Sequence, residues 1–212
     1  QEEEKNEGRK RTWEVRMFLA RHRWGDGLRG RDNEGLFFKK HMRSNPYRSA
    51  LESAWDFPKP GVRFWDFTPL HQDPALFKRG VEEMSEHFAA KAPTKIVAVE
   101  AKGFVLGGAL AYALGLPLAL VRKPGLTPGA VLSESFEKEY GTGEYQLKAG
   151  VIQPGDRALV VYDILAGPGA TQAAFRLVER CGGLVIGAAY AIELAYLGGR
   201  EALPGHELFA LA

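Results

Sequence analysis

The amino-acid sequence predicts an α/β domain with a mainly parallel sheet flanked by helices. Short apolar segments alternate with helix-like segments from residue 73 onwards, a pattern typical of βαβ units. In residues 157–171 an apolar run ends in Asp163 and leads through a small-residue turn into a helix-like stretch. Such a turn presents backbone N–H groups to an anion at the carboxyl end of a strand. A chain of 212 residues is long enough for one such domain and an extension.

The first expected elements are helical. Residues 45–55 indicate a short helix that leads into a Pro- and Gly-rich turn. Asp73 followed by Pro74 marks the start of a longer helix, because Asp caps helix N-termini and Pro suits the first helical position. Four apolar side chains then recur on one face at helical spacing: Phe77, Val81, Met84 and Phe88.

The later elements alternate between strand and helix. The expected strands cover residues 96–99, 118–121, 157–161 and 184–192, the expected helices cover residues 107–114 and 169–181, and residues 208–211 suggest an edge strand. Residues 126–148 are polar and Gly-bearing, which indicates a hairpin or a mobile hood. Residues 103–121 carry no charge and approach the length of a membrane span. Because glycines and Pro117 interrupt that stretch, we expect a buried helix and a buried strand, with no membrane span.

Cysteine and histidine usage narrows the chemistry. The single cysteine, Cys181, excludes an internal disulfide framework and a Cys-based zinc site. Its place on an apolar helix face predicts packing in the core. His71, His87 and His206 are scattered without the spacing of metal ligands, so we assign no protein metal site.

Positive charge is concentrated before the predicted domain. Residues 9–48 carry twelve Lys or Arg against four acids, although the net charge of the whole chain is only +2. We therefore divide the chain into a basic N-terminal arm, residues 1–48, partly extended or disordered, and a domain, residues 49–212. Aromatic side chains between the basic ones suit a phosphate backbone or an acidic protein surface. A solvated, flexible arm or the remnant of a targeting segment explains the same composition.

Five motifs resemble those of the adenine phosphoribosyltransferases. Residues 57–70, FPKPGVRFWDFTPL, resemble the family's opening FPxPGIxFxDITPL, and residues 100–104, EAKGF, resemble its EARGF turn. Three further matches follow in the family's order: RKPG at residues 122–125, EYGT at 139–142 and IEL…GR at 192–200. The resemblance covers about residues 45–212. It implies a type I phosphoribosyltransferase fold, a mainly parallel sheet flanked by helices, with a hood and a flexible loop.

The resemblance also implies a reaction and the residues that serve it. Members of the family join adenine to the ribose of phosphoribosyl pyrophosphate, forming AMP and releasing pyrophosphate, with Mg²⁺ accompanying the phosphoribosyl pyrophosphate. By this resemblance Glu139, on the mobile loop, is the candidate general acid or base. The candidate substrate-binding residues are Lys102, Arg122, Tyr140, Asp163, Ala166, Gly167, Gly169, Ala170 and Thr171.

The central motif departs from the family where substrate is bound. The family's VVDDLLATGGT has two adjacent acids, and here Tyr162 takes the place of the first. In the phosphate loop Pro168 has no N–H, and Thr171 stands one position late. Lys102 replaces the arginine of EARGF, which keeps the charge without the bidentate geometry. Because each lost charge-assisted hydrogen bond costs roughly 1.5–3 kcal/mol, we expect a degraded substrate site.

Three functional hypotheses follow. The first is a non-catalytic structural or interaction subunit of a larger complex, such as an organellar ribosome, with protein or RNA bound through residues 9–48. The second is an active adenine phosphoribosyltransferase of purine salvage, in which Glu139 serves as acid or base. The third is a sensor that binds AMP or adenine without turnover. The family's common pairing adds a possible homodimer, and the arm suggests a mitochondrial or other organellar location, with the cytoplasm as the alternative.

Overall fold

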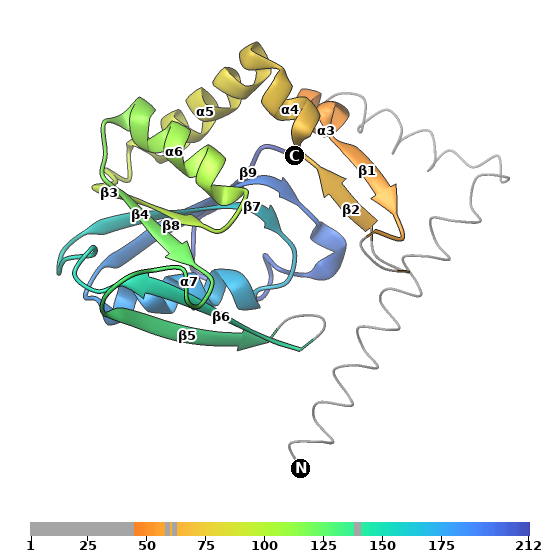
Figure 1. Cartoon of the computed structure of the whole chain (residues 1–212). Helices are drawn as coiled ribbons and strands as arrows, with labels where there is room; N and C mark the ends of the chain where they lie inside the picture. Colours follow the sequence, from red (N-terminus) through yellow and green to blue (C-terminus); the bar gives the residue numbers. More distant parts are fainter. Residues whose placement is uncertain (1–44, 58–59, 61–62, 138–140) are drawn as a thin grey trace, which may run out of the picture.

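The computed structural model describes residues 45–57, 60, 63–137 and 141–212 (Figure 1). The predicted basic arm lies outside the described residues as far as residue 44, and so do Glu139 and Tyr140. The described fold begins at Asn45, whose side-chain amide donates to the carbonyl oxygen of Leu211 at 2.7 Å. Tyr47 is only 3% exposed and packs in the core, so the last residues of the predicted arm pack with the domain.

A mixed sheet forms the centre of the described fold, with strand order β5-β6-β4-β3-β7-β8-β9. Its parallel strands are β3 (Lys95–Val99), β4 (Leu118–Arg122), β7 (Arg157–Leu165), β8 (Leu184–Glu193) and β9 (Leu208–Ala210). At one edge β5 (Val131–Glu137) and β6 (Thr142–Lys148) form an antiparallel hairpin beside β4. The mainly parallel sheet is thereby confirmed, and so is a hairpin within residues 126–148.

Helices cover both faces of the sheet (Figure 1). Helices α5 (Pro74–Ala89) and α6 (Gly103–Leu114) lie on one face, where Phe88 and Leu110 are fully buried. Helix α7 (Gly169–Arg180) lies on the opposite face and buries its apolar side against the same sheet. The sheet is therefore the middle of three layers, and the carboxyl ends of its parallel strands are left to the loops that follow them.

The uncharged stretch of residues 103–121 forms helix α6, which starts at Gly103 rather than at the predicted residue 107, and strand β4. The predicted burial holds for one face of each element only, because Tyr112 is 92% exposed and Leu118 and Leu120 are exposed as well. A Cβ atom at Gly107 would lie 2.5 Å from the Cβ of Ala98, so glycine allows α6 to pack closely on β3. None of the helices in the described ranges combines the length and the hydropathy that a membrane crossing requires.

Helix α5 begins where the sequence predicts. A carboxylate oxygen of Asp73 accepts the backbone N–H of Leu76 at 2.9 Å, and Pro74 occupies the first turn. Helix α7 also agrees with its prediction, and Cys181, its C-terminal cap, packs partly buried against the core. Local capping and apolar periodicity were sufficient for both helices, because each depends on residues that are close in sequence.

The predicted helix over residues 45–55 is wrong beyond Ala50. Helix α3 (Pro46–Ala50) is followed by strand β1 (Glu52–Trp55), which pairs antiparallel with β2 (Arg63–Asp66) in a separate ribbon. All four residues of β1 are exposed, so no alternation of buried and exposed side chains marks the strand. A short helix, α4 (Thr68–Gln72), which the sequence analysis also lacks, leads from the ribbon to α5.

Strand β7 continues beyond its predicted end at residue 161. Its pairing with β8 extends through Ile164, opposite Ile192, to Leu165, opposite Glu193. Asp163 therefore lies within a strand rather than in the turn after it, and the sheet fixes its backbone.

Candidate active site

The carboxyl ends of the parallel strands bring the predicted site residues to one edge of the sheet. Lys102 follows β3, Arg122 ends β4, and Asp163 lies near the end of β7. The β1–β2 ribbon reaches the same edge, because the Lys102 ammonium donates to the backbone carbonyl of Trp65 at 3.3 Å. This is the edge at which open α/β sheets bind ligands.

Lys102 links the sheet to the β1–β2 ribbon at this edge. Its Nζ atom lies 3.7 Å from Oδ2 of Asp163. The same ammonium lies 4.4 Å from the ring centre of Phe64 and 4.8 Å from that of Phe67, within cation–π range. The side chain remains 33% exposed, so its charge can also meet an anion from solvent.

Asp163 is held where its negative charge is unfavourable. Its side chain is only 13% exposed, and burial raises the pKa of the carboxyl group. The ammonium of Lys102 and the backbone N–H groups of Asp163 and Ile164 oppose that rise. A ligand that donates further hydrogen bonds, such as a sugar diol, would stabilise the charged form.

The turn after β7 presents backbone rather than side chains. It spans residues 166–168, and α7 starts directly after it at Gly169. Within the described part of the chain no side chain caps this helix, and the first N–H groups of an α-helix have no partner inside the helix. Pro168 lacks an N–H at the cap position, but those of Gly169, Ala170 and Thr171 remain. Backbone donors at a helix N-terminus suit an anion.

Glycines on both sides allow other backbone to approach this turn. A Cβ atom at Gly169 would lie 2.5 Å from the carbonyl oxygen of Glu137, so the end of β5 rests on the first turn of α7. A Cβ atom at Gly199 would clash with the carbonyl group of Ala166. The family motif marks Gly199 in the sequence, but nothing in the sequence predicts this contact with the turn.

The hydroxyl group of Thr171 does not face the turn. Thr171 is 2% exposed, and its Oγ1 atom lies 3.1 Å from the hydroxyl of Tyr190 on β8. The neighbouring Ala170 packs partly buried against the same core. The side chain of Thr171 therefore holds α7 to the sheet, and its backbone N–H is the group left for a ligand.

The guanidinium group of Arg122 contacts other residues of the protein. Its Nη1 atom donates to the carbonyl oxygen of Leu126 at 2.6 Å, and its Nε atom lies 3.6 Å from Oε2 of Glu100. The same carboxylate oxygen accepts the backbone N–H of Lys123 at 3.0 Å. The pair of Glu100 and Arg122 therefore joins the ends of β3 and β4 and shapes the loop after β4.

Tyr162, which stands where the family has an acid, makes a contact that the sequence analysis lacks. Its hydroxyl oxygen lies 2.9 Å from that of Tyr145 on β6, seventeen residues earlier in the chain. Burial raises the pKa of both tyrosines above the usual range. The contact joins separate strands, so no local pattern in the sequence marks it.

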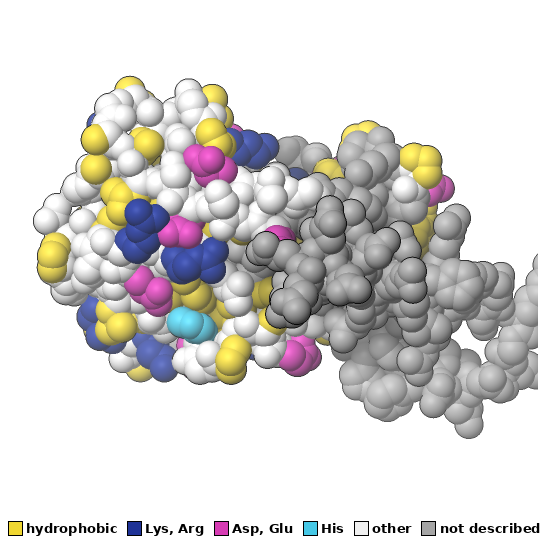
Figure 2. All heavy atoms as spheres, turned by 90° about the horizontal axis from the view of Figure 1, so that it is seen from below, with side chains coloured by type: hydrophobic (Ala, Val, Ile, Leu, Met, Phe, Trp, Pro, Cys, Tyr) yellow, Lys and Arg dark blue, Asp and Glu magenta, His cyan; other side chains and the backbone are white. Residues whose placement is uncertain are grey.

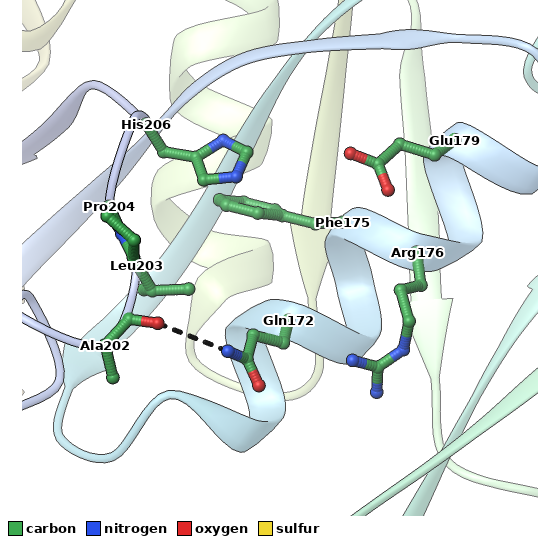
Figure 3. Close-up of a pocket in the computed structure, with 8 residues that line it drawn as sticks. All are labelled: Gln172, Phe175, Arg176, Glu179, Ala202, Leu203, Pro204 and His206. Atoms are coloured by element: carbon green, nitrogen blue, oxygen red, sulfur yellow. Dashed lines mark hydrogen bonds between the residues drawn. The ribbon is translucent and has the colours of Figure 1, made fainter.

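A cavity of about 270 Å³ lies along α7 (Figure 3). Eight residues line it: Gln172, Phe175, Arg176, Glu179, Ala202, Leu203, Pro204 and His206. Gln172 donates to the carbonyl oxygen of Ala202 at 3.3 Å, and the rings of Phe175 and His206 pack with their centres 4.6 Å apart. None of the predicted site residues lines this cavity, so we place the candidate site at the carboxyl edge of the sheet.

The sheet, the β1–β2 ribbon and the charged carboxyl edge together define a phosphoribosyltransferase domain. The family model described as phosphoribosyl transferase domain matches residues 68–201. The adenine phosphoribosyltransferase of Desulfitobacterium hafniense (strain Y51) is 45% identical over 170 residues, which cover 80% of this chain and 98% of that relative. The chain belongs to the adenine phosphoribosyltransferase family.

Solved structures of adenine phosphoribosyltransferases share the fold. The crystal structure from Rhodothermus marinus is 38% identical, with a TM-score of 0.75, and the match covers 82% of this chain and 98% of that one. The structure from Saccharomyces cerevisiae, complexed with D-2,5-dideoxy-2,5-imino-altritol 1,6-bisphosphate and adenine, is 31% identical, with a TM-score of 0.73. That match covers 82% of this chain and 99% of the yeast chain. The predicted type I phosphoribosyltransferase fold is confirmed.

The hypothesis of a non-catalytic subunit with a degraded site is wrong. Relatives that are 45% and 38% identical, matched over nearly their whole length, are adenine phosphoribosyltransferases, which favours the enzyme. The prediction counted a missing acid at Tyr162, a missing arginine at Lys102, missing side-chain hydroxyls and one missing N–H. The first turn of α7 still offers backbone donors, however, and Asp163 still contacts Lys102. The comparisons give no support to the RNA-binding and complex-subunit hypotheses.

Proposed function

We propose that this protein is an active adenine phosphoribosyltransferase, which makes AMP and pyrophosphate from adenine and phosphoribosyl pyrophosphate. The observation that carries the proposal is the contact between Lys102 and Asp163, at 3.7 Å, on the strand that leads to the N-terminus of α7. A cation, a carboxylate and backbone donors are the groups that a phosphorylated sugar diphosphate needs. The 45% identical relative from D. hafniense, an adenine phosphoribosyltransferase, supports the same activity.

We assign the 5′-phosphate of the substrate to the first turn of α7. The N–H groups of Gly169, Ala170 and Thr171 lie at a helix N-terminus, where the helix dipole favours negative charge. Gly167, in the turn itself, has no side chain that would keep a phosphate away from this backbone. The S. cerevisiae relative is complexed with a bisphosphate and adenine, which supports sites for a phosphate and a base.

Asp163 accepts hydrogen bonds from the ribose hydroxyls in this proposal. Burial raises the pKa of its carboxyl group and so disfavours the charged form, which hydrogen bonds from the sugar hydroxyls would stabilise again.

The resemblance adds Mg²⁺ bound with phosphoribosyl pyrophosphate. In the described ranges no three His, Cys, Asp or Glu side chains gather into a metal site. Mg²⁺ prefers oxygen ligands, so the carboxylate of Asp163 would suit it, with substrate oxygens and water as the other ligands. The ion would neutralise charge on the pyrophosphate.

Lys102 stabilises the departing pyrophosphate. The bond from C1′ of the ribose to the pyrophosphate oxygen breaks as the bond from C1′ to N9 of adenine forms, so negative charge grows on the pyrophosphate. Adenine loses its N9 proton in this step, and Glu139 is the proposed acceptor. A cation fixed at that point stabilises the transition state more than the ground state. Arg122, held by Glu100, shapes the neighbouring loop.

The β1–β2 ribbon supplies the adenine side of the site. The ring of Phe64 and the backbone of Trp65 both lie next to Lys102, and aromatic side chains give a purine a surface to pack on.

Glu139, the proposed acid or base, lies outside the described residues. Its near neighbour Glu137 contacts Gly169 at the start of α7, which supports a role for this segment at the same site.

Formation of AMP from radiolabelled adenine tests the proposal. We expect AMP and pyrophosphate in equal amounts, and no product without phosphoribosyl pyrophosphate and Mg²⁺. Calorimetric binding of AMP by a protein that turns nothing over would replace the enzyme with the sensor hypothesis. Glu139→Gln should lower kcat by about 10²-fold, and a parent-like rate would remove the proposed role of Glu139.

A further inference from the structure

Two tyrosines reach across the sheet to meet near the candidate site. Tyr162 lies on β7 directly before Asp163, Tyr145 lies on β6, and their hydroxyl oxygens are 2.9 Å apart. Strands β4 and β3 separate β6 from β7, so the two backbones are about 14 Å apart at the usual strand spacing. Two tyrosines that meet end to end bridge this distance. An Asp at residue 162 is too short to reach Tyr145.

The contact continues from Tyr145 to α7. The ring of Tyr145 packs on that of Phe136 on β5, with the ring centres 4.6 Å apart. The space where a Cβ at Gly169 would sit is 3.6 Å from Phe136 and 2.5 Å from the carbonyl oxygen of Glu137. A continuous path of contacts therefore runs from β7, through the hairpin, to the first turn of α7.

We propose that Tyr162 is a positioning residue that acts through Tyr145. Their hydrogen bond holds the β5–β6 hairpin against the first turn of α7 and thereby fixes the backbone N–H groups that face the 5′-phosphate. This inference rests on the proposed function, which places the phosphate at that turn. Where the family has the first of its two adjacent acids, this chain has a side chain that supports the phosphate site from within.

A second attachment holds the hairpin farther along α7. Glu134 on β5 lies 3.0 Å from Arg176 and 2.6 Å from Arg180, and Arg180 also donates to the carbonyl oxygen of Ser133. Figure 2 shows interleaved acidic and basic side chains on the underside of the molecule, where Figure 1 places α7 and β5. Ion pairs with such exposure contribute about 0–1 kcal/mol each. Arg176 also donates to the carbonyl oxygen of Ser135 at 3.3 Å, and the tyrosine pair adds a support nearer to Gly169.

The tyrosine pair remains hydrogen-bonded over the working pH range. Burial raises the pKa of Tyr145 and Tyr162, and the nearby charge of Asp163 raises both further. Glu100 adds to the rise at Tyr145. Both hydroxyls therefore stay protonated and neutral. A second carboxylate beside Asp163 would instead repel it.

Phenylalanine variants test the proposal, because they remove one hydroxyl and keep the ring. We expect Tyr162→Phe and Tyr145→Phe each to raise the KM for phosphoribosyl pyrophosphate by about 3- to 10-fold, with kcat and the KM for adenine within about 2-fold of the parent. The double variant should match either single variant, because both remove one shared bond. Tyr112→Phe, at a 92% exposed side chain on α6, is the matched control and should leave every parameter unchanged.

Amide hydrogen exchange in the ligand-free protein supplies a readout that needs no turnover. Faster exchange at residues 172–175, whose N–H groups close the first turn of α7, in both tyrosine variants and not in Tyr112→Phe, supports the proposal. Unchanged exchange there, or a lower melting temperature with an unchanged KM for phosphoribosyl pyrophosphate, overturns it. Should Tyr162→Phe not fold, Tyr145→Phe decides the question from the other side of the bond. A parent protein that forms no AMP overturns the proposed function. The exchange comparison still decides whether the hydrogen bond between the tyrosines supports the first turn of α7.

Discussion

The turn after β3 and the turn after β7 lie at the same edge of the sheet, yet they offer a ligand different groups. After β3 the useful atoms belong to side chains, since Lys102 contacts Asp163 at 3.7 Å and Glu100 organises the loop after β4. After β7 they belong to the backbone, because α7 begins at Gly169 without a side-chain cap from the described residues.

This difference shows which sequence changes the site tolerates. A backbone donor survives a change of side chain, so residues 166–170 can depart from the family motif while the N–H groups of α7 remain. A side-chain cation has no such substitute. Substitutions after β3 should therefore reduce activity more than substitutions after β7, except where a new atom has no room.

Lys102→Ala is expected to have the largest effect. Loss of the cation that faces the departing pyrophosphate should lower kcat/KM by about 10²- to 10³-fold in the AMP-forming assay. Lys102→Arg restores the residue of the family motif and should stay within about 10-fold of the parent, because the charge is kept. An alanine variant as active as the parent would exclude Lys102 from the reaction.

Asp163→Asn is expected to have the next largest effect. A neutral amide binds the ribose hydroxyls less strongly than a carboxylate, so kcat/KM should fall by about 10- to 100-fold. The same substitution should raise the free energy of unfolding at neutral pH, because it removes a buried charge. Activity and stability therefore move in opposite directions in this variant.

The pH dependence of that stability difference follows from the pKa of Asp163. Burial raises this pKa in the folded protein, so the stability contributed by Asp163 is full below its unfolded pKa and is lost as pH rises through its folded pKa. Asn does not titrate. The advantage of Asp163→Asn should therefore appear above the folded pKa and vanish in acid. Urea unfolding across a pH series measures it, and an advantage confined to acid pH would reverse our sign.

Gly169→Ala tests the close approach of the hairpin to α7. A Cβ atom there would lie 2.5 Å from the carbonyl oxygen of Glu137, so the hairpin must shift. We expect a loss of about 1–3 kcal/mol in stability and about 10-fold weaker AMP binding. Gly108→Ala, in α6 with no atom near its Cβ position, is the matched control and should stabilise the protein by up to about 1 kcal/mol. Equal stability and equal AMP binding in the two variants would contradict the close contact between Gly169 and the carbonyl oxygen of Glu137.

Pro168→Ala and Ala170→Thr are expected to have the smallest effects. The first restores an N–H and the second restores a hydroxyl of the family motif, and each should change kcat/KM by less than about 3-fold if the backbone of α7 carries the binding. A gain of about 10²-fold in either variant would show that the missing N–H or hydroxyl limits the activity of the enzyme. The prediction of a degraded substrate site would then describe this turn better than the backbone donors of α7 do.

Local sequence signals predicted the three longer helices, α5, α6 and α7, and much of the sheet. Asp73 and Pro74 place the start of α5, because capping depends on neighbours in sequence. The sequence did not predict the end of β7, because Leu165 belongs to the strand only through its pairing with β8. Strand β1 escaped as well, since its residues are all exposed and its partner strand starts only at Arg63.

The candidate site was predictable in part. The family motifs name Lys102 and Asp163, and the structure brings the two within 3.7 Å. The bond between Tyr145 and Tyr162 crosses two intervening strands, so it depends on the sheet order and not on any spacing in the sequence. The functional error had a related cause, since side-chain identities are visible in a sequence and the free N–H groups of a helix are not.

A crystal structure of the protein with AMP bound measures the central claim most directly. Our account predicts the phosphate within about 2.7–3.2 Å of the backbone nitrogens of Gly169, Ala170 and Thr171, with the ribose hydroxyls on Asp163. A phosphate bound elsewhere, with these nitrogens left to solvent, would contradict a site built on the backbone of α7.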